Sequence, residues 1–157
     1  MNPSGALQSG ITGMAPGIQV GSFDRQMQNA HAALWRDTPE SMVDLNPVTA
    51  GFSSCNGTNG AAQVGSAGDV IWGNTAAVWF GSAASYVPLA QFLPAGQYFQ
   101  SEAFAVSTFN GQYYVSGFAS RTSDHVSEAF LWVGVPGPGG LALLAGAGLL
   151  ASLSRRR

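Results

Sequence analysis

An internal repeat with a period of 44 residues constrains the fold of this chain more than any other feature. When the sequence is shifted by 44 positions, Gln19-Val20-Gly21 falls on Gln63-Val64-Gly65. The same shift places Ala32-Ala33-Leu34-Trp35 on Ala76-Ala77-Val78-Trp79, and no gap is needed between the two matches. In repeat proteins each copy is one supersecondary unit that buries its apolar face against its neighbours. The chain is therefore expected to fold as a row of similar units.

A third copy of the repeat follows with small insertions. Val64 matches Val115 at a shift of 51, and Trp79 matches Trp132 at a shift of 53. We therefore expect a β-repeat body over residues 1–132, divided into units near 2–35, 36–79 and 80–132.

Local patterns within the repeat predict strands and hairpins. Residues 41–45 alternate between polar and apolar side chains until Asn46-Pro47 stops the pattern. Residues 107–115 are typical of a hairpin, and Asn110-Gly111 at its tip favours a type I′ turn. A period near 44 suits a four-stranded propeller blade, which has roughly 40 to 50 residues. The predicted fold is mainly β, with propeller-like antiparallel β-repeats in three partial blades, followed by one C-terminal hydrophobic helix.

The best copy of the repeat resembles a known bacterial type. His31-Ala32-Ala33-Leu34-Trp35 is followed by Val43-Asp44-Leu45-Asn46-Pro47 and then by Gln63-Val64-Gly65. This order is similar to bacterial extracellular repeats built on His-Ala-x-Leu-Trp, and the resemblance implies propeller-like sheets on an extracellular protein. The second copy departs from the pattern, with Tyr86-Val87-Pro88-Leu89 in place of Val-Asp-Leu-Asn-Pro.

The first residues of the chain also match the repeat. Asn2-Pro3 falls on Asn46-Pro47, which is the end of an element rather than its beginning. From this we expect the chain to be a fragment, with further repeats and a signal peptide encoded upstream.

The C-terminal end has three parts. A Pro/Gly linker over residues 133–140 contains Val135-Pro136-Gly137-Pro138, and an uncharged apolar run over residues 141–153 follows it. Residues 154–157 close the chain with Arg155, Arg156 and Arg157, which favour the cytoplasmic side of a membrane. A membrane-spanning helix needs about 20 apolar residues, so this run is short for a permanent anchor.

This ending resembles the PEP-CTERM sorting signal of bacterial envelope proteins. Pro136 and Pro138 match the two prolines of that motif, while Gly137 replaces the usual glutamate. The resemblance implies insertion of residues 141–153 into membrane lipid, cleavage by an exosortase-like enzyme, and delivery to the cell surface or the exopolysaccharide matrix. Related tails also end some ice-binding proteins, which implies nothing about ice binding here. A permanent single-pass anchor and a buried core helix are the alternative interpretations.

Composition excludes several classes of function. Charged residues make up 9% of the chain, where about 25% is usual, and the many aromatic residues argue against disorder. The net charge is −2, and without the three terminal arginines the body is near −5. This charge disfavours nucleic acid as a partner. The single cysteine, Cys55, rules out an internal disulfide and is expected to be a small semi-buried residue.

No motif for catalysis, metal or cofactor binding is present in the sequence. His31 and His125 have no Cys or acidic residues at zinc-ligand spacing, so we expect a strand-end or turn histidine at each position. Asp44 is expected to cap a turn with its side chain. The recurring tryptophans, Trp35, Trp79 and Trp132, are expected to be core residues rather than a sugar platform. Trp72 lies outside the repeat pattern and is the tryptophan expected to contact a ligand.

The combined prediction is a non-catalytic β-repeat protein of the bacterial cell envelope. We expect its body to lie outside the membrane and its C-terminus to be inserted until processing. The alternative is a secreted carbohydrate-binding or enzymatic protein whose site lies in a missing N-terminal part.

Overall fold

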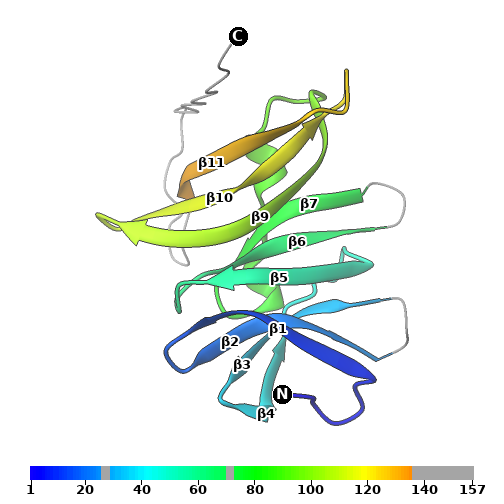
Figure 1. The fold of residues 1–157 in the computed structure, drawn as a ribbon, viewed down its shortest axis with the longest axis vertical. Helices are drawn as coiled ribbons and strands as arrows, with labels where there is room; N and C mark the ends of the chain where they lie inside the picture. Colours follow the sequence, from blue (N-terminus) through cyan, green and yellow to red (C-terminus); the bar gives the residue numbers. More distant parts are fainter. Residues whose placement is uncertain (26–28, 70–72, 136–157) are drawn as a thin grey trace.

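The computed structural model describes residues 1–25, 29–69 and 73–135, and it is mainly β (Figure 1). Sheet 1 contains β1 (Gln8–Ala15), β2 (Ile18–Asp24), β3 (His31–Arg36) and β4 (Thr38–Asp44). Sheet 2 contains β5 (Phe52–Thr58), β6 (Gln63–Asp69), β7 (Gly73–Trp79) and β8 (Val87–Pro88). Sheet 3 contains β9 (Tyr98–Phe109), β10 (Gln112–Arg121) and β11 (Ser127–Val135). Two single-turn 3₁₀ helices, η1 (Ala83–Ser85) and η2 (Leu89–Phe92), follow β7.

Each sheet is an antiparallel meander in which consecutive strands are neighbours, and the three sheets stack in chain order (Figure 1). The described sheets form an open stack, so the predicted mainly β fold is confirmed but no closed propeller is present in this part of the chain. The predicted C-terminal helix over residues 141–153 lies outside the described residues. Within the described ranges, no helix is long and apolar enough to cross a membrane.

The strand register repeats with the period found in the sequence. In sheet 1, Gln19 pairs with Trp35, and in sheet 2, Gln63 pairs with Trp79. The first strand of each sheet carries a bulge at the equivalent place, after Ile11, Cys55 and Ala103. The sheets span residues 8–44, 52–88 and 98–135. Sheets 1 and 2 therefore end one strand after their tryptophan, whereas the described part of sheet 3 ends with the strand that carries Trp132.

The strand pairing aligns the third copy with the second copy in a different register from the one that residue identity suggests. Val115 pairs with Trp132, so its counterpart in sheet 2 is Gln63 and not Val64. Ser116 takes the place of Val64, and Gly117 takes the place of Gly65. The identity of two valines was misleading here, because a shift of one residue along a strand moves a side chain to the opposite face.

Two apolar layers lie between the sheets. Between sheets 1 and 2, Trp79 and Cys55 pack with Val20 and Leu34, and all four are buried. Between sheets 2 and 3, the buried cluster includes Trp132, Val78 and Val115. Trp79 and Trp132 thus each face the preceding sheet. On the outer face of sheet 1, Trp35 is covered by Met1, Ala6 and Met42.

Polar contacts also connect each sheet to the next. The Ser53 hydroxyl on β5 accepts a hydrogen bond from the Ala32 amide at 2.9 Å and donates one to the Asn46 side chain at 2.6 Å. The Ser101 hydroxyl on β9 accepts the equivalent bond from the Ala76 amide at 2.9 Å. These buried serines satisfy backbone donors at the sheet-to-sheet interface, so they fix how far each sheet is displaced along its neighbour.

The predicted hairpin between β9 and β10 is confirmed. Asn110 has φ 49° and Gly111 has φ 73°, and a type I′ turn requires positive φ at both central residues.

Candidate functional site

Most of the residues predicted to be functional lie outside the described part of the chain. These are Trp72, Pro136, Gly137, Pro138 and the three terminal arginines. Val135 is the last residue of β11, and its backbone pairs with Tyr113. The predictions for the sorting motif, the membrane helix and the Trp72 ligand contact therefore stay predictions.

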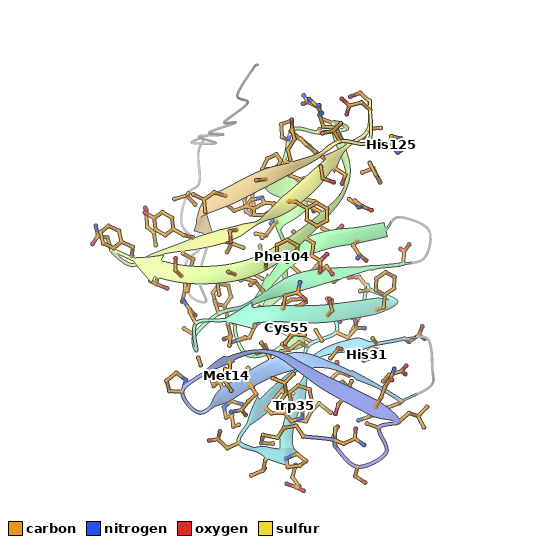
Figure 2. All side chains as sticks on the ribbon, viewed as in Figure 1. Met14, His31, Trp35, Cys55, Phe104 and His125 are labelled. Carbon is orange, nitrogen blue, oxygen red and sulfur yellow. The ribbon has the colours of Figure 1, made fainter. Side chains whose placement is uncertain are left out.

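A histidine and a carboxylate meet at one end of sheet 1. His31 begins β3 and Asp44 ends β4, which brings His31 Nδ1 to 2.8 Å from Asp44 Oδ2 (Figure 2). The other carboxylate oxygen of Asp44 accepts a hydrogen bond from the Asn46 amide at 2.8 Å. Both expectations, a strand-end histidine and a turn-capping aspartate, are confirmed. Both side chains are about one third exposed or more, at 32% and 41%, so solvent screens their attraction.

This pair lines a pocket of about 210 Å³ together with Phe23, Arg25 and Asn29. The Phe23 and His31 rings pack in a T-shaped arrangement at a centroid distance of 5.6 Å, and the Arg25 guanidinium lies 5.2 Å from the centroid of the Phe23 ring. The pocket is smaller than typical ligand sites, which are about 300 to 1,000 Å³. The described residues that line it offer hydrogen-bond donors and acceptors but no hydroxyl or thiol nucleophile.

The pocket is specific to sheet 1. Thr75 and Pro88 occupy the positions in sheet 2 that correspond to His31 and Asp44. Sequence reasoning found His31 and Asp44 through the repeat motif, but it missed Phe23 and Arg25. The repeat gives no signal for them, because Ala67 and Asp69 stand at their places in the second copy.

The three recurring tryptophans are buried, as predicted for core residues. Trp35 and Trp79 have no exposed surface, and Trp132 is 5% exposed. None of their Nε1–H groups has a hydrogen-bond partner among the described residues. A sugar platform needs an accessible ring face, so these three side chains do not form one.

Cys55 is fully buried between sheets 1 and 2 rather than semi-buried. Burial raises the pKa of its thiol from 9.0 to about 12, although weak hydrogen bonds to the Gly57 and Val64 carbonyls act in the opposite direction. Because the thiolate is the nucleophilic form, this residue is a packing group and not a reactive one.

The raised pKa predicts a loss of stability in alkaline solution. Above about pH 9 the unfolded thiol releases its proton while the folded thiol retains it, so the free energy of unfolding falls as pH rises. The expected slope is about 1.4 kcal/mol per pH unit. Urea unfolding of the wild type and of Cys55→Ala at about pH 8 and pH 10 checks this. The variant should be less stable at both pH values. Its free energy of unfolding should, however, lack the fall with rising pH that the Cys55 thiol causes. Equal slopes in the two proteins would contradict the prediction.

Two acidic side chains at or after the turn between β10 and β11, Asp124 and Glu128, serve local structure. Arg121 binds both carboxylate oxygens of Asp124 and also contacts Glu128 at 3.2 Å. Glu128 accepts a hydrogen bond from the Tyr98 hydroxyl at 2.9 Å. Over residues 1–25, 29–69 and 73–135, no group of three or more His, Cys, Asp or Glu side chains could hold a metal ion.

Comparisons with protein-family models, with curated proteins and with solved structures found no match to this chain. Its function therefore has to be argued from its own residues.

Proposed function

We propose that this chain is a non-catalytic, repeat-built β protein of the bacterial cell envelope, delivered by a C-terminal sorting tail of the PEP-CTERM type. The order of the tail supports delivery: a Val-Pro-x-Pro motif, an apolar run and three arginines follow directly after the last described strand. In this proposal an exosortase-like enzyme cuts the chain near Val135–Pro138 and releases the body to the cell surface or the exopolysaccharide matrix.

The observation that carries the structural part of the proposal is the repeated sheet-to-sheet interface. Four-stranded antiparallel meanders that stack face to face are the building plan of propeller blades. Sheets 1 and 2 have this form, and their registers agree residue by residue at the 44-residue shift. We therefore interpret each sheet as a propeller-type blade whose role is to build an extended extracellular surface.

The distinctive polar groups of the blades act within the structure itself. Ser53 and Ser101 bind backbone amides of the preceding sheet, Asp44 caps a turn, and Cys55 fills the core. This use of the polar groups supports a structural role over a catalytic one.

Mass spectrometry of the C-terminus tests the proposed delivery. The full chain with a signal peptide is expressed in a bacterium that has an exosortase and in the same strain without it. We expect loss of residues 139–157 from the surface protein only in the first strain. A Pro136→Ala, Pro138→Ala double variant should retain the tail in both strains, whereas Pro94→Ala in the body should be processed normally. An intact Arg157 on surface protein from the exosortase strain would overturn the proposal in favour of a permanent anchor.

A further inference from the structure

The chain forms the same kind of sheet-to-sheet interface twice, between sheets 1 and 2 and between sheets 2 and 3. The outer faces of sheets 1 and 3 each correspond to one side of that interface. In that interface the first strand of one sheet lies against the face of the preceding sheet, with β5 on sheet 1 and β9 on sheet 2 (Figure 1). The side chains that β5 presents to sheet 1 include Ser53 and Cys55, which are 1% and 0% exposed. Their counterparts on β9, Ser101 and Ala103, are 2% and 0% exposed.

One half of this interface is open on β1. By register, Ile11 corresponds to Cys55 and Ala103, and Met14 corresponds to Thr58 and Val106. Ile11 is 45% exposed and Met14 is 72% exposed, and Figure 2 labels Met14 near the β1–β2 turn. The Ser9 hydroxyl occupies the place of Ser53, but it donates a hydrogen bond to the Met1 carbonyl instead of accepting one from another sheet.

The other half of the interface is open on sheet 3. By register, Leu131 corresponds to Leu34 and Val78, which are 1% and 0% exposed beneath the next sheet. Leu131 itself is 56% exposed, and Val133 on the same face is 50% exposed.

Phe104 is the bulge residue of β9, and its ring packs beside Phe118 at a centroid distance of 5.7 Å (Figure 2). The bulge residues of sheets 1 and 2, Thr12 and Asn56, use their side chains to bind the Cys55 and Ala103 carbonyls of the following sheet. Phe104 therefore lies where a following sheet would make contact, and it is 49% exposed.

We propose that the outer face of sheet 3 binds the exposed face of β1 in a second copy of this chain, in the register of the internal interfaces. Each open face has the same register positions as one side of an interface formed within the chain, and the two sides are complementary. Such an interface is heterologous, so it closes into a ring or extends as a filament. The proposal does not depend on the sorting tail.

Charge-insertion variants test the association. Ile11→Arg and Leu131→Arg each change an exposed side chain, so both proteins should fold, which far-UV circular dichroism verifies. Sedimentation velocity of the full chain, in a mild detergent that solvates the apolar C-terminal run, should show self-association of the wild type. Each variant should raise the dissociation constant by about 100-fold or more, because an unpaired arginine would be buried. Val48 is fully exposed in the loop that connects β4 to β5, so Val48→Arg should leave association unchanged.

Mixing the two variants distinguishes the proposed contact between sheet 3 and β1 from a contact between two identical faces. The Ile11→Arg copy keeps an intact sheet 3 face, and the Leu131→Arg copy keeps an intact β1 face. An equimolar mixture should therefore form a 1:1 complex through one intact interface, which neither variant forms alone. Association that Leu131→Arg abolishes and mixing does not restore would indicate contact between two sheet 3 faces and overturn the proposal. Association unchanged in both variants would assign it to the C-terminal run, and a wild type that stays monomeric would also overturn the proposal.

Disulfide trapping tests the register independently. The internal contact between Thr12 and the Cys55 backbone places Phe104 of one copy next to Ile11 of the other. We expect a mixture of Phe104→Cys and Ile11→Cys proteins to form a cross-linked dimer under mild oxidation, and a mixture of Phe104→Cys and Val48→Cys proteins to form none. Equal yields from both mixtures would contradict the register.

Discussion

Gly65→Ala is expected to lower the free energy of unfolding by about 3 kcal/mol or more. Gly65 lies on β6 in the central sheet, next to the bulge of β5. A Cβ at this position would overlap the Ser54 carbonyl oxygen and lie 2.8 Å from the Cys55 Cα. Both atoms belong to the backbone of a paired strand, so the strand has to shift and the bonds between β5 and β6 weaken. The equivalent glycines, Gly21 and Gly117, face the same overlap with the carbonyls of Gly10 and Glu102.

Gly10→Ala is the matched control for this substitution. Gly10 lies on a paired strand, but a Cβ there would meet nothing within 4 Å. Both substitutions restrict the unfolded chain equally, an effect that stabilises by about 0.4 to 1 kcal/mol, so the comparison isolates the overlap in the folded state. Urea unfolding followed by far-UV circular dichroism measures both. If Gly65→Ala were as stable as Gly10→Ala, the close approach at the bulge would not be a constraint on the fold.

The repeat allowed much of this fold to be predicted from the sequence. A gapless shift of 44 residues aligned β2 and β3 with β6 and β7, and the observed register agrees at every pair the two sheets share. The buried tryptophans follow from the same argument, because a residue that recurs at one place in every unit packs against the next unit. The Asn110-Gly111 turn was predictable because few sequences tolerate positive φ at two adjacent residues.

Other features required the structure because no local pattern specifies them. Residue identity matched Val115 to Val64. However, Val115 pairs with Trp132 whereas Val64 pairs with Val78, so the strand register does not support that match. The bulges after Ile11, Cys55 and Ala103 each insert one extra residue into the first strand of a sheet. The three inserted residues, Thr12, Asn56 and Phe104, are of different types, so the sequence does not reveal them. The pocket at His31 depends on Arg25, which is near it in space but is absent from the repeat. The predicted sorting motif lies outside the described residues.

Trp79→Ala is expected to destabilise the chain by about 3 to 5 kcal/mol. The indole is fully buried in the layer between sheets 1 and 2, where it packs with Leu34 and Leu45 and lies 5.9 Å from the Tyr86 ring centroid. Its removal leaves a cavity that two hydrogen-bonded sheets cannot easily collapse to fill. The Nε1–H has no hydrogen-bond partner among the described residues, so the expected loss comes from packing and apolar burial rather than from a broken hydrogen bond.

Trp79→Phe measures how much of this stability a smaller aromatic ring can retain. Phenylalanine keeps one aromatic ring in the layer but is smaller than indole and lacks the unpartnered donor, so its loss should be smaller than the loss in Trp79→Ala. Urea unfolding followed by far-UV circular dichroism is suitable because it does not rely on the fluorescence of the substituted residue. Equal losses in the two variants would contradict the view that retained aromatic packing in this layer stabilises the fold. A loss under about 1 kcal/mol in Trp79→Ala would mean that the layer between sheets 1 and 2 is not the core of this fold.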